Sequence, residues 1–464
     1  MLASGSHRSG INVEYECIGG NEYILTANVF RDCNDAELVP NINVFIYSSC
    51  NTIGYVSFPL VSTEEVSQLC DAELPNSTCN GGFQPGVELG VYEITIELEP
   101  CDDWRFVVSE QNRDEAILNI VNPELFTIHV EGFLNNADGT CNTSPQLTTV
   151  NLPYICMGSP LYYNLGFVDA DNDSLSYAFV EAQSSTTPLN PEPVDYGPGY
   201  SGMTPMENIE IDPQTGQIYL EPGMLGKFNI VVEVSEYRDG VLVGKVAHDF
   251  IFIVTACPTP SPAPDINSFL NVSGGAYPLD HNTFSVCADD DFCISIDFTS
   301  SDPAVNVDLT SNIDDIIPGA TESVTPGNPA TIEICGTIPS DYNGTPFLIT
   351  AKDDACPVYG QGYYAVNFEH RQPLQAFQDT AICPGESVEL FAINDTSYQW
   401  FDGSGNMVDP GEASCNPCAN PVFTPDSSTT YIVEGLYANS NCPNTDSVRV
   451  EIPLELESIL TEET

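Results

Sequence analysis

Short runs in which apolar and polar residues alternate constrain the fold of this chain more than any other feature. In one run, Thr95 and Glu97 separate Ile94, Ile96 and Leu98, and similar runs occupy 13–17, 42–46, 126–130 and 230–234. Successive side chains of a strand point to opposite faces of a sheet, so this period predicts half-buried antiparallel strands. Helical periodicity is nearly absent, and the capping-box spacing of Ser62 and Glu65 predicts one short helix over 62–70. We therefore expect an all-β fold of tandem antiparallel β-sandwich domains.

The chain has 464 residues, which is too long for one ordinary core. A Pro-rich stretch at 258–264 predicts a stiff extended linker, and weaker changes of pattern follow residues 152–156 and 372. We expect domains at 1–150, 151–257, 258–372 and 373–453, with a short acidic tail at 454–464. The second and third are similar in layout, because each ends in two hydrophobic strands around an Asp/Gly turn, at 228–254 and 347–368.

The charge balance is strongly acidic, with 67 Asp and Glu against 10 Lys and Arg and a formal net charge of -57. Nucleic acids and anionic membranes are bound by clustered cations, so we expect neither as a partner. No stretch approaches the ~18 uncharged apolar residues of a membrane span, which argues against direct membrane insertion. Salt and divalent cations relieve carboxylate repulsion, so a salty, calcium-bearing exterior such as seawater fits best.

The 17 cysteines are spread along the whole chain, and no C-x-x-C pair recurs at zinc-ribbon spacing. They indicate disulfides in a secreted protein, with one thiol left over, either free or paired between chains. Cys415 and Cys418 predict a local disulfide, and Cys383 and Cys442 are candidates for an end staple around Trp400. The third domain holds four further candidates with three connectivities open to them: Cys287, Cys293, Cys335 and Cys356.

Three carboxylates two residues apart, at Asp169, Asp171 and Asp173, form the sharpest local motif. Hard oxygen ligands at this spacing suit Ca²⁺, which takes six to eight oxygens. Glu236 and Asp239 would add ligands if the end of the 230–234 strand folds back beside the Asp-rich turn. The motif is not an EF-hand, because Gly and Glu are absent at the sixth and twelfth positions, and the alternative is a solvated acidic turn.

Catalysis finds little support in the sequence. Neither an H-E-x-x-H nor a G-x-S-x-G motif is present, and the five histidines are scattered. His129 lies on the outward face of an alternating strand, where we expect it to be solvated. A glycosidase needs only two carboxylates, but no cleft-forming framework is evident. We therefore expect no enzymatic activity.

Three cysteine motifs occur in order near the N-terminus: Gly10-Ile-Asn-Val-Glu-Tyr-Glu-Cys17, Phe30-Arg-Asp-Cys33 and Tyr47-Ser-Ser-Cys50. This region resembles the N-terminal part of large Bacteroidota surface proteins that are related to gliding-motility and adhesion proteins and exported by the type IX secretion system. The resemblance covers about the first 257 residues. It departs from the family at Gln111 and Asn112, where a Cys pair is common, so the family's disulfide pattern does not transfer.

The resemblance carries further expectations for individual modules. Residues 151–257 and 258–372 resemble cadherin-like modules, in which a D-x-D-x-D turn binds Ca²⁺, and 373–453 has an Ig-like layout. Bacteroidota O-glycosylation follows a D-[ST]-hydrophobic rule, which makes candidates of three hydroxyl residues: Ser174, Thr380 and Ser447.

The leading hypothesis is a non-enzymatic part of a secreted bacterial surface adhesin or extracellular appendage, stiffened by disulfides and Ca²⁺, that attaches to cell-surface or glycan ligands. Self-assembly into a homo-oligomer or fibre is a secondary hypothesis, since sheet edges and an odd cysteine suit lateral association. The alternative is a secreted carbohydrate-binding or carbohydrate-active β-sandwich protein, and a third is a sheath protein without a receptor.

Overall fold

The computed structural model describes residues 8–110, 112–148, 154–257, 260–265, 272–274, 276–280, 282–287, 291–339, 342, 344–377, 379–409, 411–435 and 444–453. These residues form an all-β fold built mainly of antiparallel strands, as predicted. The described helical turns are short: η1 (Leu74–Asn76), η2 (Thr78–Asn80), η3 (Pro123–Leu125) and α1 (Ile313–Ile316). The chain divides into a first unit, Met1–Phe269, Ser295–Ile334 and Asn343–Asn367, and a second unit, Leu270–Ile294, Cys335–Tyr342 and Phe368–Thr464.

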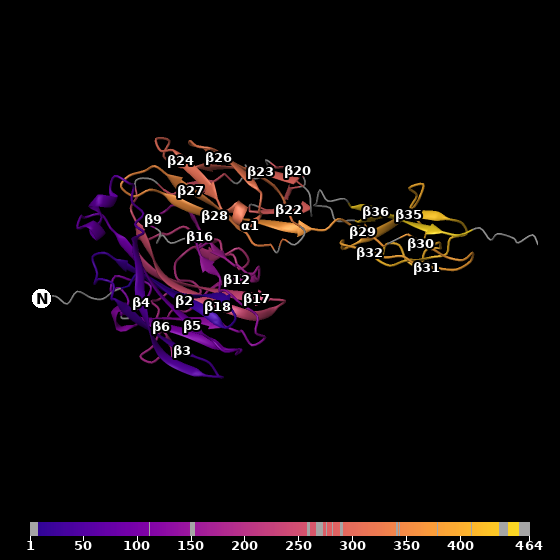
Figure 1. Ribbon diagram of the computed structural model, residues 1–464. Helices are drawn as coiled ribbons and strands as arrows, with labels where there is room; N and C mark the ends of the chain where they lie inside the picture. The colour runs from indigo at the N-terminus through magenta and orange to yellow at the C-terminus, as the bar shows by residue number, and fades with distance from the viewer. Residues whose placement is uncertain are drawn as a thin grey trace, which may run out of the picture. The chain divides into compact units, whose positions relative to one another are not determined.

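The first unit contains a sheet whose pairing path closes on itself. Figure 1 labels several of its strands, among them β2, β3 and β18. The order β18-β1-β2-β5-β4-β3-β6-β7 returns to β18, because Gly244 and Lys245 of β18 pair with the end of β7. The strands are β1 (Gly10–Gly19), β2 (Glu22–Asp32), β3 (Asn41–Tyr47), β4 (Thr52–Glu65), β5 (Val87–Glu97), β6 (Trp104–Glu110), β7 (Ile128–Leu134) and β18 (Val241–Thr255). Such closure leaves few free strand edges.

The predicted alternation is confirmed in these strands. In β3, Ile42, Val44 and Ile46 point inward and are 0–3% exposed, while the residues between them are exposed or half-buried. The helix predicted over 62–70 is wrong, because β4 continues to Glu65 and pairs with β5 through Glu88. Cross-strand pairing there outweighs the local capping-box signal.

Strands from residues 154–257 continue the same sheet across the boundary that we expected near residue 150. β17 (Gly226–Arg238) and β18 form a long antiparallel hairpin, and β12 (Ser174–Phe179) pairs with β17. The stretch also holds β9 (Tyr154–Cys156), β10 (Leu161–Tyr163), β11 (Phe167–Val168), β13 (Gln183–Ser184), β14 (Glu192–Pro193), β15 (Ile209–Ile211) and β16 (Ile218–Leu220), and β11 pairs with β8 (Gln146–Leu147). Residues before and after 150 therefore share one sheet and its cores.

Residues after the Pro-rich stretch contribute to both units. In the first unit, β27 (Phe347–Asp353) and β28 (Gln361–Arg371) form the antiparallel hairpin predicted at 347–368, and β24 (Val307–Ser311) pairs with β27. Pro258 of the predicted linker lies outside the described residues, whereas β19 (Ala263–Pro264) pairs with Thr299 and Phe298. The other strands are β20 (Val272–Gly274), β21 (Tyr277–Pro278), β22 (Thr283–Cys287), β23 (Asp291–Thr299), β25 (Thr321–Thr325) and β26 (Ala330–Thr337).

Within the first unit, two sets of contacts fasten β27 and β28 to the rest. The Gln217 side chain donates to the carbonyl oxygens of Tyr163 and Tyr363, each at 3.0 Å, and accepts from the Ala365 amide at 2.6 Å. A disulfide joins Cys70 to Cys356 across 286 residues of sequence, beside the 2.9 Å hydrogen bond from the Cys70 amide to the Pro357 carbonyl. These contacts cross-link parts of the chain that the sequence assigns to different domains.

The C-terminal part of the second unit has its own core. Its main sheet has the order β30-β36-β35-β33, and Trp400 lies fully buried with its indole donating to the Cys418 carbonyl at 2.9 Å. The strands are β29 (Gln375–Ala376), β30 (Thr380–Ala381), β31 (Val388–Glu389), β32 (Ala392–Ile393), β33 (Tyr398–Asp402), β34 (Val422–Phe423), β35 (Thr429–Gly435) and β36 (Thr445–Glu451). The acidic tail at 454–464 lies outside the described residues.

Most of the cysteine expectations can be compared with the structure. Cys415 and Cys418 form the predicted local disulfide, and Cys293 pairs with Cys335, but Cys356 pairs outside the third domain. Cys287 is disulfide-bonded. The remaining described disulfides are Cys17–Cys141, Cys33–Cys79, Cys50–Cys101 and Cys156–Cys257. Cys383 carries a free, exposed thiol, and Cys442, its expected partner, lies outside the described residues.

The helical turns of the described residues contain only three or four residues each, so none of them could span a membrane.

Candidate metal centre

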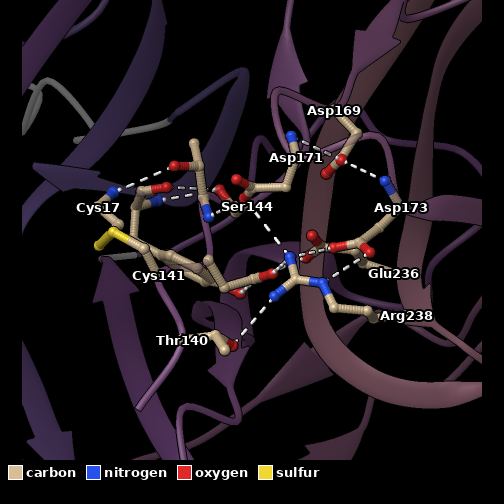
Figure 2. A network of polar contacts seen from close by, with 12 residues as sticks. Cys17, Thr140, Cys141, Ser144, Asp169, Asp171, Asp173, Glu236 and Arg238 are labelled. Carbon is tan, nitrogen blue, oxygen red and sulfur yellow. Dashed lines mark hydrogen bonds and ion pairs between the residues drawn. A yellow bond between two sulfur atoms is a disulfide. The ribbon is translucent and has the colours of Figure 1, made fainter. Parts of the chain in front are cut away.

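The Asp-rich turn connects β11 to β12. The Asp169 Oδ1 atom accepts hydrogen bonds from the backbone amides of Asp171 and Asp173, at 3.0 and 2.7 Å. Asn172 at the tip has a left-handed backbone with φ of 61°, which Asn tolerates better than most residues. The turn thereby directs the carboxylates of Asp169 and Asp173 toward the neighbouring strand (Figure 2).

Strand pairing supplies the third carboxylate. β12 pairs with β17 in a register that sets Leu175 opposite Glu236, only a few residues from the turn. Carboxylate oxygens of Asp169, Asp173 and Glu236 lie within 4.8 Å of one another. Glu236 is 0% exposed and Asp173 is 5% exposed, so the group is largely removed from water.

Neighbouring polar groups hold part of this cluster in place. The Arg238 guanidinium donates to both carboxylate oxygens of Asp173, at 2.9 and 2.5 Å, and to the Asn142 side chain at 2.7 Å. Asn142 in turn donates to Glu236 Oε2 at 2.9 Å. Asn142 follows Cys141, whose disulfide to Cys17 anchors the loop, as Figure 2 shows.

Two oxygens of the cluster lack hydrogen-bond donors. Asp169 Oδ2 and Glu236 Oε1 are buried without a hydrogen-bond partner. Burial, followed by the charge of Asp169, raises the pKa of Glu236 to about 10, and burial also raises the pKa of Asp169. Carboxylates that face each other in this way hold a shared proton or a cation.

The donor set fits a hard divalent cation. All three groups offer carboxylate oxygens, which Ca²⁺ prefers, and two of those oxygens have no competing donor. Asp173 is engaged by Arg238, so Asp169 and Glu236 are the residues best able to hold a cation, with Asp173 beside them.

The five predicted ligands do not all meet. Asp171 turns aside: its Oδ2 accepts from the Thr143 amide at 2.6 Å and lies 3.8 Å from Arg238. Asp239 is exposed in the β17–β18 turn and does not belong to the carboxylate trio. Sequence reasoning missed Asn142 and the role of Arg238, because only the fold brings the loop after Cys141 to this site.

A second group of potential ligand atoms comprises Cys50, Cys101, Asp102 and Asp103. Cys50 and Cys101 form a disulfide, so their sulfurs are not thiolates and the group does not qualify as a metal site.

The expectation of a solvated His129 is wrong. His129 is 5% exposed, because β7 pairs at this residue with β13, and its Nδ1 lies 2.9 Å from Ser109 Oγ. Burial and the nearby Arg113 lower the pKa of His129 to about 4, and its Nε2 has no hydrogen-bond partner. A histidine with so low a pKa and no orienting acid is a poor general base for Ser109.

The glycosylation candidates lie on strands. Ser174 begins β12 and is exposed, although its hydroxyl donates to the Tyr237 carbonyl at 3.1 Å. Thr380 is half-buried in β30, and Ser447 is exposed in β36. Their modification stays a prediction.

No protein-family model and no curated protein matches the sequence. Among solved structures, the chain is similar to the N-terminal eight Ig domains of the Down syndrome cell adhesion molecule, at 9% identity with a TM-score of 0.28, covering 96% of this chain and 49% of that one. It therefore spans about half the length of that structure. The four-domain ectodomain fragment of ICAM-5 is similar at 9% identity with a TM-score of 0.26, covering 94% and 96% of the two chains. Likenesses this weak carry no argument about function.

Proposed function

We propose that this chain is a non-enzymatic, extracellular part of a bacterial surface adhesin or appendage, and that it mediates attachment to other surfaces or cells. In this proposal the first unit is a rigid body fixed by disulfides and by one Ca²⁺ at Asp169, Asp173 and Glu236. The Bacteroidota resemblance of the cysteine motifs supports an outer-surface location with export by the type IX system and a link to gliding motility.

One observation carries the proposal. The Cys17–Cys141 disulfide anchors a loop that contacts the buried Glu236 carboxylate through Asn142, and the exposed Asp171 of the Asp-rich turn through the Thr143 amide. Disulfides persist in oxidising surroundings, and a weak hard-ion site fills where calcium is plentiful. Both conditions hold outside the cell. Repulsion among the carboxylates of a chain with a net charge of -57 destabilises the folded state, and a bound cation reduces that repulsion.

Thermal unfolding with EGTA and with millimolar Ca²⁺ tests the calcium part. A ligand at a hundredfold excess over Kd adds about 2.7 kcal/mol to the free energy of unfolding. We expect this gain in the wild type and its loss in Asp169→Asn, where the amide oxygen can still accept from the turn amides. Asp402→Asn changes an exposed carboxylate in the second unit and should keep the full gain.

If Ca²⁺ gives no gain in the wild type, the carboxylates hold a shared proton and the calcium part fails. The adhesive part has a separate test, in which deletion of the gene should reduce surface attachment while leaving the cell envelope intact. Unchanged attachment would contradict it and favour a sheath protein.

A further inference from the structure

A groove of about 600 Å³ lies on the outer face of strands β3, β4 and β6 in the first unit. Phe45 of β3 pairs in register with Tyr55 of β4 and with Val107 of β6, and all three line the groove. The remaining lining includes amide and hydroxyl side chains such as Asn43, Ser109 and Thr127. Its volume is in the range of small-molecule sites in proteins, which lies at roughly 300–1,000 Å³.

The groove is also lined by a cation, Arg8, whose charge is not balanced by an ion pair with any described carboxylate. Arg8 is 4% exposed, its Nη1 donates to the Ala36 carbonyl at 3.0 Å, and its Nε is buried without a hydrogen-bond partner. A buried charge is costly unless a counter-charge accompanies it. Among the described residues no carboxylate forms an ion pair with Arg8, although Glu37 also lines the groove and is exposed.

This lack of an ion pair is unusual for the molecule. Of the 10 Lys and Arg residues, eight form carboxylate ion pairs in the described part of the chain: Arg31, Arg105, Arg113, Lys227, Arg238, Lys245, Arg371 and Arg449. Lys352 instead lies 3.8 Å from the centre of the Tyr359 ring. In a chain with 67 acidic residues, Arg8 therefore has a position that suits a carboxylate from outside the chain.

The aromatic residues indicate the rest of the ligand. Tyr55 is 65% exposed, and its ring meets that of Phe45 edge to face at 5.0 Å, so an aromatic surface is open to solvent. Sugar rings have apolar C–H faces that pack on aromatic rings, and hydroxyl edges that bond to amides and hydroxyls. Ser109, held by His129, presents one such hydroxyl in the groove.

We propose that this groove binds a short oligosaccharide carrying a single carboxylated sugar. The carboxylate pairs with the Arg8 guanidinium, a geometry that permits two parallel hydrogen bonds, and a neighbouring sugar ring packs on Phe45 and Tyr55. A single charge is specified because a net charge of -57 repels polyanions. The inference deepens the proposed function, since it names the ligand class through which an adhesive surface would act.

Calorimetric titration in 0.5 M NaCl compares two trisaccharides that differ only in the terminal sugar, glucuronic acid or glucose. We expect the acidic ligand to bind at least tenfold more tightly than the neutral one. Arg8→Gln should abolish this preference while leaving the weak binding of the neutral ligand unchanged. Tyr55→Ala should weaken both ligands about tenfold, whereas Phe83→Ala, a 79% exposed aromatic residue outside the groove lining, should change neither.

Equal affinity for the two ligands, no binding of either, or a preference that survives Arg8→Gln would overturn the inference, as would equally tight binding of an acetylated acidic tripeptide. If Arg8→Gln does not fold, the ligand pair and the Tyr55→Ala and Phe83→Ala comparison still decide it. The titrations are repeated with EGTA and with Ca²⁺. Sugar binding that persists in EGTA does not depend on the metal, so this result is separate from the calcium part of the proposed function.

Discussion

The first unit and the C-terminal part of the second unit are both antiparallel β structures, but they are stabilised in different ways. The first unit buries charged groups and joins distant segments by disulfides, such as Cys70–Cys356. The C-terminal part has one apolar core around Trp400, a disulfide across three residues, and acidic turns that lie in water.

Two acidic turns make the difference concrete. Asp169 is half-buried, and burial raises its pKa. Asp402 in the C-terminal part accepts hydrogen bonds from the Asn406 side chain and from the Ser404 and Asn406 amides, and these bonds lower its pKa. Asp-initiated turns thus give a carboxylate cluster with unpartnered buried oxygens in one region and a hydrogen-bonded, solvated turn in the other.

Removal of the long-range disulfide should have the largest effect. In the chain-entropy description, a disulfide that closes 286 residues stabilises by about 5–6 kcal/mol, whereas one that closes three residues contributes about 1–2 kcal/mol. We expect the double variant Cys70→Ser/Cys356→Ser to lose most of the larger amount, and Cys415→Ser/Cys418→Ser to lose only the smaller. Calorimetry measures the two losses in the free energy of unfolding, and hydrogen exchange shows in which unit the protection of the backbone amides decreases.

Equal losses in the two double variants would show that the Cys70–Cys356 disulfide does not constrain the unfolded chain. The comparison between the units would then rest on packing alone.

The buried ion pair should give the next effect. Arg113 and Asp249 are 0% and 2% exposed, with an Nη2–Oδ2 distance of 2.7 Å, and Asn229 also donates to Asp249. Asp249→Asn leaves a buried guanidinium without its counter-charge, so we expect a loss of about 3–5 kcal/mol. In the C-terminal part, Arg449 and Glu451 are 54% and 60% exposed, and Glu451→Gln should cost less than about 1 kcal/mol.

Chemical denaturation of both variants checks this contrast. Unfolding of the first unit is followed for Asp249→Asn, and unfolding of the second unit for Glu451→Gln. A loss below about 1 kcal/mol for Asp249→Asn would mean that water or neighbouring groups replace the carboxylate. The burial of charge would then not distinguish the two regions.

Much of the fold was predictable because its signals are local. Alternation in 42–46 and 230–234 predicts which face of a strand is buried, and the hydrophobic hairpins at 228–254 and 347–368 are present. The meeting of Glu236 with the Asp-rich turn was also predictable, since adjacent antiparallel strands bring their ends together.

The remaining features depend on contacts between distant residues. Nothing near Cys70 indicates Cys356 as its partner, and nothing near residue 150 indicates that β18 pairs with both β1 and β7. The burial of His129 likewise depends on β13, which lies more than fifty residues further along the chain. Local pattern fixes strands and faces, while long-range pairing decides domains and sites.

The smallest expected effect concerns the pH dependence of the first unit. Glu14 on β1 is 5% exposed, its Oε1 accepts from Asn12 at 2.7 Å, and burial raises its pKa to about 8. The folded state therefore keeps a proton that the unfolded chain loses above about pH 4.5. The stabilisation is fully present below that pH and is lost as the pH rises toward 8.

We expect the free energy of unfolding of the wild type, relative to Glu14→Gln, to fall by up to about 1.4 kcal/mol for each pH unit between pH 5 and 7. Using the difference between the two proteins removes the contributions of other titrating groups, including Glu236. Glu451→Gln, the same change at an exposed position of the second unit, should give no such slope. A difference that rises with pH would mean that Glu14 is ionised in the folded protein and that neighbouring groups compensate its charge. Buried acids would then stabilise the first unit at neutral pH rather than destabilise it.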